Sequence, residues 1–268
     1  MPNPLIARRL AIVPTLRCTL KCKLCSNHMH LFKNPYDVPM DKMKHDIDRL
    51  FELFDRIEWL QFVGGEVFIR KDMAEIYEYV RKYKSQFDKL IIMTNATIAP
   101  RPAEIKALKK YGDNCEIMIS DYGKYSYKRD EMTAICEKEH IPYICKGYSG
   151  NNQYFDGWID NSSFKKFSGT EQELAEQRAQ CPQARIKNMH CFNGKLHRCS
   201  NSCFMTELGV NHPAASDYVD LYDDSQTLEE KRNIIRGFYA KPVMSCRICS
   251  WWNAEHAERF PAAQQIEG

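Results

Sequence analysis

The chain has 268 residues and a formal net charge of +3, with 44% hydrophobic and 27% charged residues. This ordinary globular composition allows one large α/β domain with a small appendage, and the small net charge does not favour nucleic acid or an anionic membrane as a partner. Because no apolar run of about 18 residues and no signal-peptide pattern occurs, we expect a cytoplasmic protein without a transmembrane helix.

Short apolar runs alternate with helical patterns over the first 150 residues. We expect strands at 8–15, 59–65, 89–96, 115–123 and 142–149. We expect helices at 40–57, 71–83, 101–112 and 128–139. Strands that alternate with helices in this way predict a parallel sheet. The pattern fades before a full eight-unit barrel is complete, so the predicted fold is α/β, a partial, open (β/α)5-6 barrel of the TIM type.

The composition changes twice beyond the predicted barrel. A glycine- and asparagine-rich stretch with aromatic residues marks a loop, and from Cys181 the chain is rich in cysteine. The Asn193-Gly194 pair predicts a hairpin turn there. We therefore expect a barrel core at 1–150, a connecting segment at 151–180 and a cysteine-rich domain of a hairpin plus helix at 181–268.

Twelve cysteines require an explanation. In a reducing compartment, clustered cysteines indicate metal or redox sites more often than disulfides. Seven of them fall into spaced groups, namely Cys18, Cys22 and Cys25, then Cys181 and Cys199, then Cys246 and Cys249. The other five are expected to be small buried hydrophobic residues, namely Cys115, Cys136, Cys145, Cys191 and Cys203.

The first cysteine group lies in the loop after the first strand, at the end of a barrel where catalytic residues gather. Polar groups also follow the next three strands, namely Gly64, Gly65 and Glu66, then Thr94 and Asn95, then Ser120 and Asp121. A cubane iron–sulfur cluster normally takes four cysteine ligands, so three leave one iron open to a small molecule. A zinc ion would instead need a fourth ligand, from His28 or His30.

The segment CTLKCKLC, residues 18–25, resembles the CxxxCxxC motif of the radical S-adenosylmethionine (SAM) enzymes, and GGE follows the second strand as in that family. The resemblance covers residues 8 to about 150. It implies a [4Fe–4S] cluster whose open iron binds SAM, and reductive cleavage of SAM to methionine and a 5′-deoxyadenosyl radical. A reducing partner such as flavodoxin or ferredoxin is implied as well.

The resemblance also implies which residues contact SAM, namely Leu24, Gly64, Gly65, Glu66, Asn95, Ser120, Asp121 and Arg129. The two glycines let the backbone approach a ligand, and Glu66 would accept hydrogen bonds from the methionine ammonium group. Ser120 and Asp121 match positions that bind the ribose and the methionine end, and Arg129 would pair with the methionine carboxylate. Leu24 stands where the family usually has an aromatic residue near the adenine.

The second cysteine group resembles the twitch domain, a shortened SPASM domain. Twelve residues separate Cys181 from Gly194, four more precede Cys199, and a CxxC pair follows. The resemblance implies an auxiliary [4Fe–4S] cluster on Cys181, Cys199, Cys246 and Cys249. A zinc ribbon is the alternative. Cys191 and Cys203 are rival ligands, which we leave out of the set.

These resemblances predict an oxidoreductase that abstracts a hydrogen from a small polar substrate of the sugar or cyclitol type, similar to 2-deoxy-scyllo-inosamine dehydrogenase. Asp156 and Asp160 are candidates for the catalytic group that takes up a proton. A maturase of a ribosomally made peptide, forming a crosslink or epimerising a residue, is the alternative, ranked lower because no leader-binding segment is visible. A cluster-bearing redox or binding protein without SAM cleavage is the third hypothesis.

Overall fold

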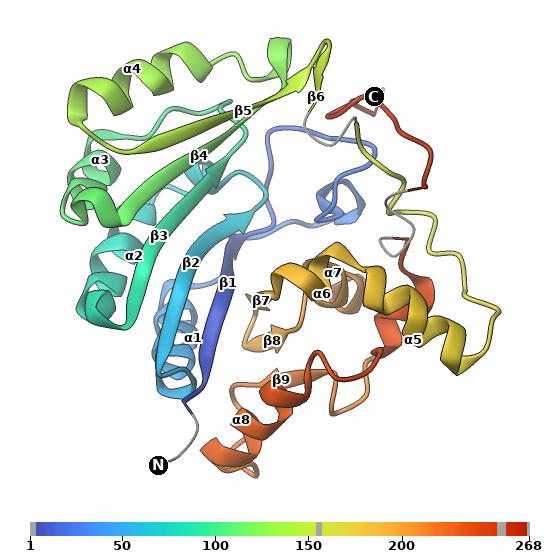
Figure 1. Ribbon diagram of the computed structural model, residues 1–268. Coiled ribbons are helices and arrows are strands. Elements are labelled where there is room, and N and C mark those ends of the chain that lie inside the picture. The colour runs from blue at the N-terminus through green and yellow to red at the C-terminus, as the bar shows by residue number, and fades with distance from the viewer. Residues whose placement is uncertain (1–3, 154–156, 251–255, 267–268) are drawn as a thin grey trace.

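The computed structural model describes residues 4–153, 157–250 and 256–266. Its strands form a nine-stranded sheet in the order β6-β5-β4-β3-β2-β1-β7-β8-β9 (Figure 1). The strands are β1 (Ile6–Thr15), β2 (Arg56–Gly64), β3 (Phe87–Thr94), β4 (Cys115–Asp121), β5 (Tyr143–Ser149), β6 (Asn152–Gln153), β7 (Asn188–Phe192), β8 (Lys195–His197) and β9 (Tyr218–Asp220). The helices are α1 (Met40–Leu53), α2 (Met73–Val80), α3 (Pro102–Lys109), α4 (Arg129–Glu139), α5 (Glu171–Gln180), α6 (Pro182–Ile186), α7 (Ser200–Glu207) and α8 (Leu228–Gly237).

Strands β1 to β5 are parallel neighbours, and α1 to α4 connect them along one side of the sheet (Figure 1). The central strands are buried on both faces, as continuous apolar runs in a parallel sheet require. Ile12 in β1 and Ile92 in β3, for example, are at most 1% exposed. Helix α1 packs an apolar stripe, which includes Ile47 and Leu50, into the same core. The predicted partial barrel is confirmed.

The first predicted helix is too long. Helix α1 ends at Leu53, and Ile57 instead lies in β2 beside Ala7 of β1. Asp55 explains the difference, because its backbone N–H donates to the Leu5 carbonyl at 2.9 Å and its carboxylate accepts from the Leu5 N–H at 2.6 Å. These two bonds hold the chain in an extended course toward β2.

The second half of the chain continues the sheet of the first. The predicted hairpin is confirmed, with Asn193 and Gly194 at φ angles of 53° and 79° between β7 and β8. Strand β7 pairs in parallel with β1, where Ile12 lies beside Cys191. Apolar residues of this half, such as Phe204 in α7, belong to the same core as β1. The predicted division at residues 150 and 180 stays a prediction, and one sheet and one core run across it.

Cysteines outside the spaced groups fall into two kinds. Four are buried in the core as predicted, namely Cys115, Cys136, Cys191 and Cys203. The prediction for Cys145 is wrong, because it is exposed on β5, where the neighbouring Ile144 is exposed too. Within the described residues, no helix is both long and apolar enough to cross a membrane.

Candidate functional site

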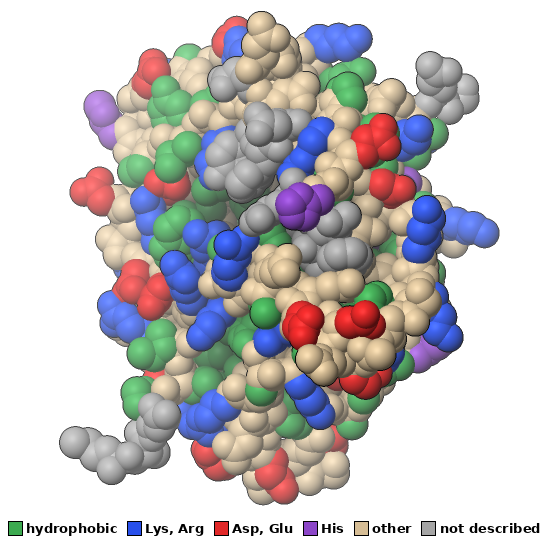
Figure 2. Space-filling view, turned by 45° about the vertical axis from the view of Figure 1, so that its right-hand side comes forward, with side chains coloured by type: hydrophobic (Ala, Val, Ile, Leu, Met, Phe, Trp, Pro, Cys, Tyr) green, Lys and Arg blue, Asp and Glu red, His purple; other side chains and the backbone are tan. Residues whose placement is uncertain are grey.

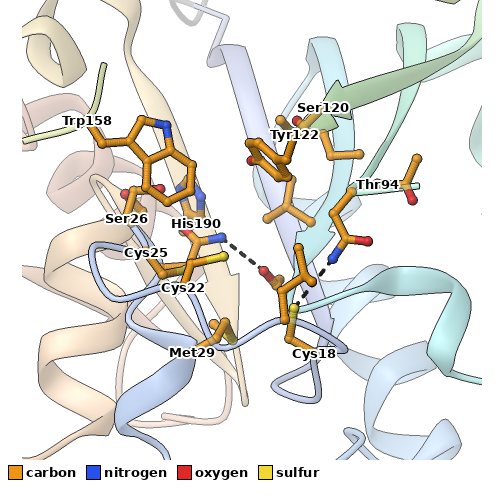
Figure 3. A pocket seen from close by; sticks show the side chains of 18 of the residues that line it. Cys18, Cys22, Cys25, Ser26, Met29, Thr94, Ser120, Tyr122, Trp158 and His190 are labelled. Carbon is orange, nitrogen blue, oxygen red and sulfur yellow. Dashed lines mark hydrogen bonds between the residues drawn. The ribbon is translucent and has the colours of Figure 1, made fainter. Parts of the chain in front are cut away.

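The three cysteines of the first loop line one cavity, with a volume of about 280 Å³ (Figure 3). The loop leaves β1 at Thr15, whose hydroxyl contacts the Asp37 carboxylate at 2.6 Å. Arg17 pairs with the same carboxylate at 2.9 Å. Asp37 thereby fixes the start of the loop, while Cys22 is 7% exposed and the other two thiols are partly buried.

Gly64 and Gly65 bring the end of β2 against the backbone of the cysteine loop. A Cβ on Gly65 would lie 1.9 Å from the Arg17 carbonyl oxygen, and one on Gly64 would lie 2.5 Å from that of Thr15. The Glu66 N–H donates to the Arg17 carbonyl at 2.9 Å. Both glycines also line the cavity, so their contact with SAM stays a prediction beside this structural role.

Glu66 is fully buried behind the rim and is not among the residues that line the cavity. Its carboxylate accepts hydrogen bonds from the Phe68 N–H at 3.1 Å, the Thr94 hydroxyl at 2.9 Å and the Asn95 N–H at 2.8 Å. Burial raises the pKa of this carboxyl to about 7. Glu66 therefore organises the turn after β3, and its predicted contact with the methionine ammonium group stays a prediction.

The Asn95 side chain reaches from that turn to the first cysteine. Its Nδ2 lies 3.6 Å from the Cys18 Sγ and 3.3 Å from the Thr19 hydroxyl, and its Oδ1 accepts from the Thr97 hydroxyl at 2.6 Å. These contacts fix the amide of Asn95 with its donor toward the sulfur. An amide donor at this place stabilises negative charge on a ligand thiolate.

The remaining predicted SAM contacts divide between the cavity and its surroundings. Ser120 lines the cavity. Asp121 and Arg129 pair with each other at 2.9 Å, and Leu24 is buried. None of these three belongs to the described cavity lining, so their contacts with SAM stay predictions.

A wall of the cavity that the sequence analysis missed comes from later in the chain. It consists of Tyr122, Trp158, Gln183, Asn188, His190 and Ser200. The rings of Tyr122 and Trp158 lie near each other in Figure 3, with centroids 5.5 Å apart and planes at 90°. Strand alternation places Asn188 and His190 on one face of β7, whereas Met189 and Cys191 enter the core on the other. That alternation within NMHC was the signal available in the sequence.

His190 is 4% exposed, and burial lowers its pKa to about 4. Its Nδ1 lies 3.3 Å from the Asn188 carbonyl oxygen, so this nitrogen carries the proton and donates. Nε2 of the neutral ring is then the acceptor. Because no charged side chain occurs in the described lining, the cavity suits an uncharged ligand part with hydroxyl groups.

The structure brings the second cysteine group together. Cys181, Cys246 and Cys249 line a small cavity with Arg178. Burial raises the pKa of Cys199 to about 11, with a further contribution from the nearby Cys246 and Cys181. The amide of Asn201 donates to the Cys249 Sγ at 2.9 Å. The rivals Cys191 and Cys203 lie in the apolar core instead.

The first cysteine group has the donors that a cluster with one open iron requires, and the cluster of the second group stays a prediction. The described part of the chain contains no three His, Cys, Asp or Glu side chains grouped to hold one metal ion, so the zinc alternative with His28 or His30 stays a prediction. In a cluster the thiolates are spread over several iron atoms. Burial raises the pKa of Cys18 and Cys22 to about 12, so both thiols stay neutral until a metal centre displaces their protons. The first group therefore fits a cluster with one open iron.

The two predicted proton acceptors, Asp156 and Asp160, stay predictions. Asp156 lies outside the described residues. Asp160 accepts a hydrogen bond from the Ser162 N–H at 2.8 Å and is not part of the described cavity lining.

Comparison with known proteins finds a family match over part of the chain. Residues 12–129 match the family described as the Radical SAM superfamily, so the chain contains a radical SAM domain. It is 31% identical over 109 residues to the antilisterial bacteriocin subtilosin biosynthesis protein AlbA of Bacillus subtilis (strain 168). This match covers 40% of the chain and 22% of the length of that relative.

A solved structure shares the fold over nearly the whole chain. The structure of BtrN in complex with AdoMet and 2-DOIA has a TM-score of 0.54 at 14% identity, and the match covers 98% of this chain and 100% of that one. The structure of anSMEcpe with bound AdoMet has a TM-score of 0.42 at 20% identity, over 53% of this chain and 42% of that one. The likeness to BtrN extends the shared fold over both halves of this chain.

Proposed function

We propose that this protein is a radical SAM oxidoreductase that abstracts a hydrogen from a small polar substrate of the sugar or cyclitol type and oxidises it. The observation that carries the proposal is the shared cavity. Its lining combines the cysteines of the radical SAM domain with uncharged hydrogen-bonding side chains from the second half of the chain.

When bound, the first cluster and SAM would supply a 5′-deoxyadenosyl radical that takes a hydrogen atom from the substrate. The thiolates of Cys18, Cys22 and Cys25 would hold this cluster. Tyr122 and Trp158, whose rings pack edge to face in the cavity lining, would limit the access of water. Asn188 and His190 would orient substrate hydroxyls, with the His190 Nε2 as the acceptor.

We assign an auxiliary [4Fe–4S] cluster to Cys181, Cys199, Cys246 and Cys249. Their convergence beside Arg178 supports this assignment. Four thiolates would leave no iron open to substrate, so the cluster would act as an electron acceptor.

A reducing partner such as flavodoxin or ferredoxin and a cytoplasmic location complete the proposal. Lys and Arg side chains gather left of the centre on the face shown in Figure 2. Such a surface suits an acidic electron-transfer protein, since complementary charge speeds association.

A peptide maturase is the second candidate. It is favoured by the sequence match to AlbA, whose name associates that protein with the biosynthesis of the bacteriocin subtilosin. The uncharged hydrogen-bonding side chains in the cavity lining keep a hydroxylated small substrate as the first candidate.

The test is substrate-dependent release of 5′-deoxyadenosine, with deuterium transfer from labelled sugars, cyclitols and peptides. One deoxyadenosine is expected for each oxidised small substrate, and Cys22→Ala should abolish release, whereas Cys145→Ala should not. Deuterium transfer from peptides alone would establish the maturase instead.

The electron-acceptor role has its own test, the double variant Cys246→Ala with Cys249→Ala. SAM cleavage and hydrogen abstraction should persist while the yield of oxidised product falls. Circular dichroism and SAM binding must accompany the kinetics, because a metal-bound subdomain draws folding free energy from its metal. A full yield of oxidised product from the folded double variant would contradict the electron-acceptor role of the auxiliary cluster.

A further inference from the structure

The segment 256–266 returns to the cysteine loop from the far end of the described chain. The Lys23 N–H donates to the Gln264 carbonyl at 2.7 Å, and the Ile266 N–H donates to the Lys21 carbonyl at 2.9 Å. These bonds form an antiparallel bridge between Cys22 and Gln265. The segment therefore lies directly along the loop that carries the three cysteines.

The same segment is held at a second place. Trp158 and Phe260 exchange two backbone hydrogen bonds of 2.8 Å each. Next to them Gly157 has a φ of +106°, and a Cβ there would lie 2.6 Å from the Phe260 carbonyl oxygen. The segment thus connects Trp158 in the cavity lining to the cysteine loop. The close contact of Phe260 with residue 157 requires a glycine there.

The side-chain amide of Gln265 is oriented by two backbone groups. Its Oε1 accepts from the Lys21 N–H at 2.7 Å, and its Nε2 donates to the Ala263 carbonyl at 2.6 Å. Exchanging the oxygen and nitrogen would put donor against donor and acceptor against acceptor, so only one orientation fits. Nε2 has a second hydrogen, and the Cys22 Sγ lies 3.3 Å away as its acceptor.

We propose that Gln265 is a positioning residue that raises the reduction potential of the SAM-binding cluster through its N–H···S bond to Cys22. The inference rests on the proposed function, because it takes Cys22 as a cluster ligand. Reduction adds negative charge that is shared with the ligand sulfurs, and a donor fixed at a sulfur stabilises the reduced state more than the oxidised one. Asn95 makes the corresponding contact to Cys18 from the barrel.

The test compares Gln265→Met with Gln264→Met in otherwise complete, anaerobically reconstituted protein. Methionine keeps the length of the side chain and removes the amide. Gln264 is exposed and pairs with the loop through its backbone carbonyl, so it is the matched control. A redox titration monitored by electron paramagnetic resonance gives the midpoint potential of the cluster whose signal changes when SAM is added.

We expect equal iron content in all three proteins, a more negative midpoint potential in Gln265→Met and the potential of the unmodified protein in Gln264→Met. Hydrogen exchange at the Lys23 amide should stay slow in both variants, which separates the lost donor from a displaced segment. An unchanged midpoint in Gln265→Met overturns the role of Gln265. If the midpoint potential of Gln265→Met shifts but hydrogen exchange at the Lys23 amide also becomes faster, the role of Gln265 is overturned too. Displacement of the segment 256–266 then explains the change in potential. If the unmodified protein has no SAM-responsive signal, the proposed function fails instead.

Discussion

The buried carboxylate of Glu66 accepts a hydrogen bond from the backbone N–H of Asn95 at 2.8 Å, in the turn after β3. From this turn the side-chain amide of Asn95 reaches the Cys18 sulfur. Glu66 thus acts on the cysteine site through a turn on the next strand. The carboxylate supports the geometry of the site from the core side.

Replacing Glu66 by alanine should therefore damage both stability and the first cluster site. A buried donor left without its partner costs about 1–3 kcal/mol. Because several donors face this carboxylate, we expect Glu66→Ala to lower the free energy of unfolding by at least about 2 kcal/mol in urea titrations and to reduce iron retention. Glu58→Ala, on the exposed face of β2, is the control and should change neither. Equal stability of the two variants would contradict the role of Glu66.

Gly65→Ala should displace the cysteine loop. The added Cβ would meet the Arg17 carbonyl oxygen, which is backbone and cannot turn away as a side chain would. We expect loss of the iron bound by the first group, measured by iron analysis and by the absence of SAM-dependent spectral change, while the second group keeps its iron. Gly237→Ala has open space around the new methyl group and should keep both. Full SAM response in Gly65→Ala would show that the loop tolerates the shift.

Iron content distinguishes ligand cysteines from core cysteines. Two cubane clusters correspond to about eight irons per chain. Replacing Cys18, Cys22 and Cys25 by alanine should leave about four. Cys203→Ala is the matched control for the second group, since this buried thiol lies one helical turn from Cys199 and packs in the core. A loss of iron in Cys203→Ala would move it into the ligand set, and bound zinc would favour a ribbon.

The buried imidazole of His190 predicts a loss of stability in acid. Its pKa, about 4 in the folded protein, lies below the ordinary value of 6.5, so the unfolded chain binds an additional proton between these values. Stability then falls as the pH falls, by about 1.4 kcal/mol between about pH 7.5 and 5.5. His190→Phe keeps a ring beside Phe204 and removes the titration. Urea unfolding at both pH values should show a shallower pH dependence in the variant, and identical dependence would refute the assignment.

The sequence predicted the barrel because each strand and helix of residues 6–149 has a local signature. Spacing predicted the first cysteine group, because three thiols stand within eight residues, whereas the second group was predicted from its resemblance to a known cysteine pattern. The capping box of Thr170 with Glu173 was a readable start for α5, which lies in the segment expected to connect the two halves. The sequence analysis does not predict this helix, because the preceding glycine- and asparagine-rich stretch indicates a loop.

Long-range partners could not be predicted in the same way. Nothing local in residues 188–192 says that this strand pairs with β1, and nothing local in Gln265 says that it faces Cys22. Arg129 illustrates the same limit, because its partner Asp121 is also a predicted ligand contact, and only coordinates show that the two neutralise each other. Such pairings depend on how the whole chain closes.

The pairing of β1 with β7 has a consequence for how the chain folds. One edge of β1 stays without its partner until residues 188–192 have been synthesised, and unpaired strand edges promote aggregation. At about 5–20 residues per second, a ribosome needs on the order of ten seconds or more to cover that distance. During that time the nascent barrel exposes an apolar strand that a chaperone or a premature contact can capture, so slower translation or the absence of chaperones should lower the yield of folded protein more than it lowers the yield of total chain.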